Sequence, residues 1–214
     1  MSGRNWHRLG STSRSLNNVR LAPLTSKDST LVFRALLQAF AFPGRVVQLP
    51  PHMVARMPAL SLPLLALTDI ETSFCAPDEP ELEGEIATIT SARISNSRDA
   101  QFVMHRDVPS REFVIGLGRG TSFRPELGAR MVLAWNAPFD ANIEVGLSGP
   151  GVVPGSSLRV GHDLVEFLAV RAEVNAQPPA GIDCWLVSTN GEVVGLPRTT
   201  QIQMQPTSAT AGRN

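Results

Sequence analysis

The stretch from residue 181 to residue 203, GIDCWLVSTNGEVVGLPRTTQIQ, contains the strongest local structural signal of the chain. Two apolar runs, residues 182–187 and 192–196, flank the sequence Ser-Thr-Asn-Gly. Asn-Gly between such runs favours a tight hairpin, because both residues tolerate positive φ and the turn then matches the twist of the strands. Pro197 has no amide hydrogen to donate to a sheet, so we expect it to end the second strand.

The residues after this hairpin combine one cation with two hydroxyl groups. Arg198, Thr199 and Thr200 follow the second strand directly. An arginine presents a rigid fork of donors that suits phosphate or carboxylate. We interpret these three residues, with Asp183, as a candidate anion-binding corner. The alternative is that Arg198 pairs with Asp183 and only locks the hairpin, since ion-pair networks and functional sites look alike at this level.

Length and composition limit the class of protein. The 214 residues fit one domain, and the zero formal net charge, with a pI of about 6.9, shows none of the basic excess typical of nucleic-acid binding. No apolar run approaches the roughly 18–20 residues of a membrane span. The N-terminus lacks the apolar segment of a secretory signal. Cys75 and Cys184 are isolated, as in reduced cytosolic proteins. We therefore expect a cytoplasmic protein.

The chain divides into a central domain and two tails. Residues 1–23 are polar, aperiodic and rich in arginine, and we predict a flexible N-terminal arm that is either solvated or a docking tail for an acidic partner. Residues 24–205 are predicted to form a single α/β domain. Residues 206–214 are predicted to form a flexible C-terminal tail.

Two helices are predicted with clear boundaries. The first covers residues 28–42, with Asp28 as its N-cap. The second covers residues 163–176, where Asp163 followed by Glu166 matches a capping box. Helical periodicity places four apolar side chains of the first helix on the face that should pack against the core. These are Phe33, Leu36, Leu37 and Phe40.

Shorter elements complete the pattern. Strands alternate with helices along most of the chain, but the last three strands follow one another. We therefore expect a layered α/β fold with a mixed β-sheet flanked by helices, parallel through crossovers and antiparallel at the C-terminal hairpin. The further elements are helical segments at 58–66, 81–93 and 110–117, and strands at 45–49, 73–75, 100–104, 130–135, 143–147 and 201–205.

Familiar catalytic patterns do not occur in the sequence. His7, His52, His105 and His162 lie far apart and form no metal-binding spacing, so we expect no metal site and interpret each as a surface or hydrogen-bonded residue. There is no GxSxG nucleophile elbow. The glycine-rich run 116–120 lacks the lysine of a P-loop and is predicted to be a plain loop. The catalytic residues stay unassigned.

Several motifs together resemble the PhnH family, the H subunit of the bacterial carbon–phosphorus (C–P) lyase core complex, which degrades phosphonates. The resemblance spans most of the chain between Phe33 and Gln203. The motifs are FRALLQAFAFPG at 33–44, GTSFRPELGA at 120–129, SGPGV at 148–152, QPPAGID at 177–183 and LPRTT at 196–200.

The resemblance implies a fold similar to that of pyridoxal-phosphate-dependent transferases. Pyridoxal phosphate needs a lysine for its Schiff base. Lys27 is the only lysine of the chain, and it precedes the first helix instead of following a strand in a pocket. We therefore expect the transferase-like fold without the cofactor lysine, and no cofactor.

The resemblance also implies a function. Acting with partner subunits, the protein would transfer the ribose triphosphate of ATP to an alkylphosphonate and displace adenine. It would be a homodimer packed against other C–P lyase core subunits, with ATP or a phosphonate bound within the complex, and without activity alone. Its substrate-binding residues would be Arg198, Thr199, Thr200, Asp183 and Arg34, although Arg34 also fits a helix-surface ion pair. Two alternatives remain, a stand-alone enzyme acting on a small anionic substrate and a purely structural scaffold.

Overall fold

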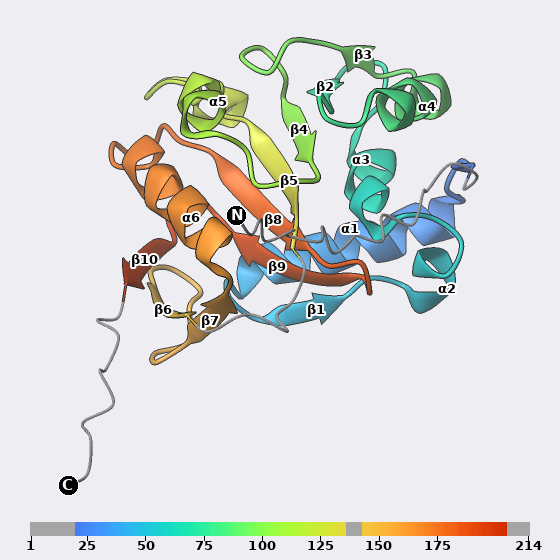
Figure 1. Ribbon diagram of the computed structural model, residues 1–214. Helices are drawn as coiled ribbons and strands as arrows, with labels where there is room; N and C mark the ends of the chain where they lie inside the picture. Colours follow the sequence, from blue (N-terminus) through green and yellow to red (C-terminus); the bar gives the residue numbers. More distant parts are fainter. Residues whose placement is uncertain (1–19, 136–142, 205–214) are drawn as a thin grey trace, which may run out of the picture.

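The computed structural model describes residues 20–135 and 143–204 and contains two β-sheets with helices packed around them (Figure 1). The larger sheet has seven strands in the order β1-β9-β8-β5-β4-β2-β3, and the smaller has three in the order β10-β6-β7. The predicted layered α/β fold with a mixed sheet flanked by helices is confirmed. Most of the predicted N-terminal arm and the whole C-terminal tail lie outside the described residues.

Five strands of the larger sheet run parallel to one another, so their carboxyl ends meet at one edge. They are short, and most of their side chains are buried, as expected when both faces of a parallel sheet are covered. The strands are β2 (Ser73–Cys75), β3 (Arg93–Ile94), β4 (Phe102–His105), β5 (Arg130–Ala134) and β8 (Asp183–Val187).

The predicted C-terminal hairpin is confirmed. Strand β9 (Glu192–Leu196) runs antiparallel to β8, and Pro197 follows it directly. The turn is closed by two backbone hydrogen bonds, from the amide of Ser188 to the carbonyl of Glu192 at 2.8 Å and from the amide of Gly191 to the carbonyl of Ser188 at 3.0 Å. Gly191 has a φ of 81°, the conformation for which glycine is favoured. Strand β1 (Val46–Gln48) extends the sheet beyond β9.

The last strand leaves the main sheet. Strand β10 (Gln201–Met204) pairs antiparallel with β6 (Ile143–Ser148), which also pairs with β7 (Ser157–Val160). The sequence predicted β6 and β10 but not β7. Two sheets therefore share the C-terminal segment, and the turn at 197–200 joins them.

The helices lie on two sides of the larger sheet, over two hydrophobic clusters. On β5, Val132 belongs to the cluster shared with α1 and α3, while Met131 and Leu133 belong to the cluster shared with α5 and α6. This alternation follows from the two-residue period of a strand. The helices are α1 (Ser26–Ala41), α2 (Pro51–Val54), α3 (Leu62–Leu67), α4 (Pro80–Thr90), α5 (Arg111–Gly116) and α6 (His162–Val174), with 3-10 turns at Ala59–Ser61 and Pro125–Leu127.

The start of α1 differs from the prediction. Thr25 is the N-cap, and its hydroxyl accepts a hydrogen bond from the amide of Asp28 at 3.1 Å. Asp28 therefore lies inside the first turn, where its carboxylate accepts from the Thr25 hydroxyl at 2.8 Å. A carboxylate in the first turn is stabilised by the positive end of the helix dipole, so the same residue type suits either position.

The prediction of which residues form the buried face of α1 is wrong in part. Leu36 is buried and Phe40 is half-buried, but the side chains of Phe33 and Leu37 are 47% and 56% exposed. The helix instead packs its small residues against the sheet. Ala39 lies so close to Gly195 that a Cβ atom added at position 195 would be 2.4 Å from the Ala39 carbonyl oxygen. The side chains that α1 buries are Val32, Ala35, Leu36 and Ala39.

Two further helix boundaries are corrected. Helix α6 begins at His162 after Gly161 without a side-chain cap, so the predicted Asp163 and Glu166 capping box does not form, and both side chains are exposed. The helix predicted at 58–66 splits into a 3-10 turn and α3, because Pro63 lacks the amide that would continue a helix through it. None of the helices in the described part of the chain has the length and apolarity that a membrane span requires.

Candidate functional site

The predicted corner is built around one ion pair at the open end of the β8–β9 hairpin. Arg198 Nη2 lies 2.6 Å from Asp183 Oδ2, and its Nε lies 3.2 Å from Oδ1. The amide of Arg198 also donates to Asp183 Oδ1 at 2.8 Å. The two side chains are only 14% and 16% exposed. This bidentate, largely buried pair is the stronger kind of charge-assisted contact.

The rest of the Arg198 guanidinium is also engaged by the protein. Its Nη1 donates to the carbonyl oxygens of Pro125 at 2.7 Å and Pro179 at 3.3 Å. A Cβ at Gly128 would lie 2.9 Å from Nη1 and 2.2 Å from the carbonyl oxygen of Gly181, so close packing there requires glycine. Each side-chain nitrogen of Arg198 therefore donates to a protein acceptor, and the pair with Asp183 ties three loops together.

A second arginine supports the same turn from inside. Arg171, on α6, is fully buried. It donates to the carbonyl oxygens of Thr200 at 3.2 Å, Leu196 at 2.7 Å and Pro197. Burial lowers the pKa of its guanidinium, while the nearby Cys184 and Asp183 oppose that shift. Arg171 thus fixes the turn by donating to backbone carbonyls.

Arg171 was not among the predicted site residues, although the sequence contains a signal for it. The residue lies three, four and seven positions after Leu168, Phe167 and Leu164, all of which are buried. Helical periodicity therefore places it on the core face of α6. A lone cation on such a face must find acceptors, because burying an unpaired polar group is costly.

The structure brings four of the five predicted residues together. Thr200 is buried beside Arg171, and its amide donates to the carbonyl of Pro197 at 2.8 Å. Thr199 is exposed next to it. Arg34 lies on the exposed side of α1, and within the described ranges no hydrogen bond or ion pair joins it to the corner. Anion binding by these residues stays a prediction.

The corner lies at the amino edge of the parallel strands. Asp183 and Arg130 are the first residues of β8 and β5 and stand opposite each other. In open α/β sheets, ligands bind beyond the carboxyl ends of the strands, at the point where the strand order reverses. Here β3 lies outside β2, whereas β4, β5 and β8 follow on its other side. The reversal point therefore lies at the carboxyl ends of β2 and β4.

A cluster of hydrogen-bonded side chains occupies that point. His105, the last residue of β4, has its Nδ1 2.9 Å from Asp78 Oδ2 and 2.7 Å from the carbonyl oxygen of Asp107. The amides of Arg106 and Asp107 donate to the same Asp78 oxygen at 2.7 Å and 3.2 Å. Arg106 in turn pairs with Glu79. The cluster joins the ends of two neighbouring strands.

The two ionisable partners shift each other's pKa. Burial disfavours the charged forms of both groups. For Asp78, the hydrogen bonds from His105 and from the amides of Arg106 and Asp107 outweigh burial and lower the pKa below its ordinary 3.8. For His105, the bond to Asp78 outweighs burial and raises the pKa above its ordinary 6.5. The prediction that the histidines are surface or hydrogen-bonded residues is confirmed for His52, His105 and His162, and His7 lies outside the described residues.

Replacing His105 with asparagine should destabilise the protein in a pH-dependent way, because asparagine keeps a donor but loses the charge. The raised pKa of His105 contributes stability that is complete below pH 6.5 and is lost as the pH rises through the folded value. The lowered pKa of Asp78 contributes stability that is complete above pH 3.8 and is lost as the pH falls through the folded value.

The difference in unfolding free energy between the wild type and His105→Asn should therefore be largest between pH 3.8 and 6.5. Urea unfolding over a series of pH values measures this difference. His162→Asn, at an exposed position at the start of α6, is the control. A difference for His105→Asn that stays constant with pH would show that the ion pair adds nothing.

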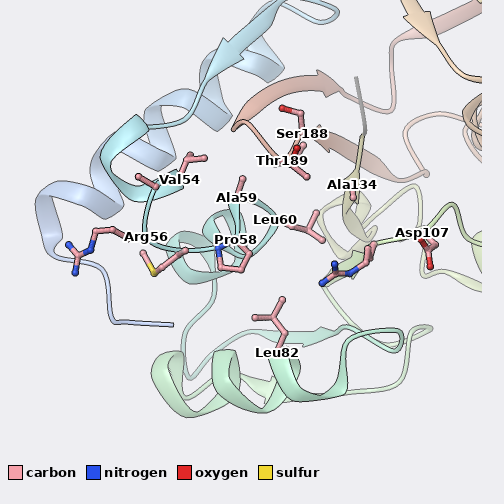
Figure 2. A pocket seen from close by; sticks show the side chains of 14 residues that line it. Val54, Arg56, Pro58, Ala59, Leu60, Leu82, Asp107, Ala134, Ser188 and Thr189 are labelled. Carbon is pink, nitrogen blue, oxygen red and sulfur yellow. The ribbon is translucent and has the colours of Figure 1, made fainter. Parts of the chain in front are cut away.

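A cleft of about 450 Å³ opens at the same carboxyl edge (Figure 2). Ser188 and Thr189, which follow β8, lie on one side of it, and Leu82 of α4 lies on the other. Arg106 also lines the cleft, while the Arg56 side chain points away from its centre. This cleft was not predicted from the sequence. The available signal was that its polar residues come directly after predicted buried strands.

Several kinds of chemistry do not fit the residues present. Burial raises the pKa of the Cys75 and Cys184 thiols to about 12, so neither is a ready thiolate. Residues 20–135 and 143–204 contain no cluster of three metal-ligating side chains. Lys27, the only lysine, is exposed in the first turn of α1. The residues therefore do not fit pyridoxal phosphate, which requires a lysine within its pocket.

Comparison with known proteins supplies the family. The family model described as "Bacterial phosphonate metabolism protein (PhnH)" matches residues 24–203. A protein of Stutzerimonas stutzeri named "Putative C-P lyase subunit protein HtxG" is 34% identical over 175 residues, which cover 81% of this chain and 85% of that protein. The matched region includes both sheets, the corner and the cleft. The chain belongs to the PhnH family of bacterial phosphonate metabolism proteins.

Proposed function

We propose that this protein is a subunit of a C–P lyase complex in phosphonate catabolism. The observation that carries the proposal is the family match over residues 24–203, supported by the similarity to a protein named as a putative C–P lyase subunit. In this function the chain acts with partner subunits to transfer the ribose triphosphate of ATP to an alkylphosphonate, with adenine as the leaving group. It works in the cytoplasm, as a homodimer in contact with other core subunits.

The chemistry of the described residues favours action in a complex over action alone. Burial raises the pKa of both thiols to about 12, and the His105 side chain, which contacts Asp78, is only 14% exposed. A nucleophile or base must be accessible and suitably ionised. We therefore propose that partner subunits supply at least part of the reacting groups, and that the isolated chain has no turnover.

The two edges of the sheet have different roles in this proposal. At the amino edge, Asp183 and Arg198 satisfy each other and nearby carbonyl groups, which favours a structural brace over a substrate ligand. At the carboxyl edge, the cleft combines apolar walls with the hydroxyl of Thr189 and with Arg106, whose contact with Glu79 is made through Nε. A concave surface with a few polar groups is the usual form of a ligand site. We propose that the anionic substrate contacts this chain at the cleft.

A substitution that fills the cleft tests this placement. In a bacterium that lacks the gene, Thr189→Trp should fail to restore growth on methylphosphonate as the sole phosphorus source, because the indole ring blocks the cleft. Asn190→Trp is the matched control, because Asn190 is the next residue of the same turn and does not line the cleft. Circular dichroism and capture of partner subunits on the tagged variants verify folding and assembly.

The outcomes separate the candidate functions. Growth with Asn190→Trp but not with Thr189→Trp supports the cleft. Equal growth with both variants would contradict the cleft and favour the scaffold alternative, which the fully engaged Arg198 also fits. Growth on methylphosphonate in the absence of the gene would contradict the proposed pathway altogether.

A further inference from the structure

One loop of the protein holds an aromatic side chain fully in solvent. Residues 119–128, which we call the knuckle, connect α5 to β5, and Phe123 at their tip is 96% exposed. Loop tips usually carry small or polar residues and move freely. A phenyl ring in this position adds nothing to the core of the chain that carries it.

Hydrogen bonds hold the knuckle at its two ends and close its tip. Thr121 and Arg124 exchange two backbone hydrogen bonds, both of 3.2 Å, and Arg119 forms a bridge with Gly128. The amide of Gly181 donates to the carbonyl of Arg119 at 2.8 Å. The Nη1 of Arg198 also donates to the carbonyl of Pro125 at 2.7 Å. Phe123 is therefore presented on a pre-ordered support, which lowers the entropic cost of inserting it into a pocket.

The same chain carries a hollow that suits such a ring. It has a volume of about 690 Å³ and lies between the start of α5 and α6, with Val114, Phe167 and Val170 among its lining residues. Three of the lining residues are carboxylates and one is an arginine, which pairs with Glu173 instead. The carboxylates are Asp107, Asp163 and Glu166, all exposed and without an ion pair to any residue in the described ranges.

The charges of the two features are opposite. The knuckle and the first residue of β5 carry three arginines, Arg119, Arg124 and Arg130, against the single carboxylate of Glu126, whose Oε1 lies 3.3 Å from Arg124 Nε in an exposed ion pair. The hollow carries its three carboxylates against Arg111. Complementary charges around an aromatic anchor are typical of specific protein interfaces.

The positions of the two features also allow exchange between two copies. Helices α5 and α6 pack against each other on one side of the sheet. The hollow is lined by the residues that follow β4, near the carboxyl edge, while the knuckle precedes β5 at the amino edge. A twofold axis perpendicular to the strands exchanges the two edges, so it can place each knuckle against the other copy's hollow in a self-complementary interface.

We propose that Phe123 of each copy inserts between α5 and α6 of a second copy of this chain, with the knuckle arginines facing Asp163 and Glu166. The inference rests on the homodimer of the proposed function and names its interface. The same interface gives a role to the ion pair between Arg198 and Asp183, because Arg198 also holds the knuckle in position through the carbonyl of Pro125.

Sedimentation velocity on the full chain, over a range of micromolar concentrations, tests the interface. The wild type should dimerise, and Phe123→Ser should raise the dissociation constant roughly 30-fold or more, as expected for a central aromatic anchor. Arg124→Asp and Asp163→Arg should each weaken the dimer, and the two substitutions in one chain should restore it. Ile70→Ser, at a site that is 78% exposed and outside both features, is the control.

The possible outcomes test the proposed interface and the existence of a dimer separately. A dimer that survives both Phe123→Ser and Arg124→Asp overturns this interface and leaves another surface, such as Phe33 and Leu37 on α1, as the contact. A wild type that stays monomeric throughout overturns the homodimer together with the interface. In either case the growth test on methylphosphonate decides the role in phosphonate catabolism independently.

Discussion

Replacing Arg171 with methionine is expected to lower the free energy of unfolding by about 3 kcal/mol or more. Methionine fills a similar space without donors, so the carbonyl groups of Leu196, Pro197 and Thr200 lose the hydrogen bonds from the guanidinium, and the carbonyl of Pro197 keeps only the amide of Thr200. Each buried polar group left unsatisfied costs about 1–3 kcal/mol. Because the turn at 197–200 joins the two sheets, its loss should also loosen β10 against β6.

Urea unfolding with a far-ultraviolet signal measures the effect. The matched control is Arg159→Met, because Arg159 is exposed on β7 and a surface substitution usually changes stability by no more than about 0.5 kcal/mol. Equal stability of the two variants would show that the buried guanidinium is not needed to hold the turn.

Arg198→Ala should lower the free energy of unfolding by about 3–5 kcal/mol. The substitution leaves the carboxylate of Asp183 largely buried without its cation, and it removes the donor to the carbonyl of Pro125. Arg198→Lys should recover only part of the loss, because an ammonium group cannot form the bidentate contact. Hydrogen exchange should rise in the knuckle, whose position depends on this arginine.

Arg34→Ala is the natural control for Arg198, because both residues were candidates for the same anion site. Arg34 is exposed, so its removal should change stability by no more than about 0.5 kcal/mol. The double variant Arg198→Ala, Asp183→Ala should be more stable than Arg198→Ala alone, since the unpaired charge is gone. A single Arg198→Ala variant as stable as the wild type would contradict the brace.

Local signals in the sequence predicted much of the fold. The Asn-Gly turn between two apolar runs predicted the β8–β9 hairpin, and that hairpin brings Asp183 next to Arg198, because Cys184 pairs with Leu196. Four of the five predicted site residues therefore meet. The hairpin and the meeting of these residues both depend on contacts within one short segment, where turn chemistry and strand pairing decide the geometry.

Features that depend on distant contacts could not be predicted in this way. Apolar residues cover more than one side of α1, so periodicity alone could not show that Gly195 selects Ala39 and leaves Phe33 and Leu37 in solvent. The cleft draws its lining from segments spread from Val54 to Thr189. Its position follows only when the strand order is known, because the reversal between β2 and β4 is a property of the whole sheet.

The release of adenine from ATP in the presence of methylphosphonate tests most directly whether this subunit works only in a complex. Three mixtures are compared, the purified chain alone, the partner C–P lyase subunits alone, and the two combined. We predict adenine release, and formation of the phosphonate-linked ribose triphosphate, only in the combined mixture. Release by the isolated chain, or equal release by the partner subunits without it, would contradict the proposal.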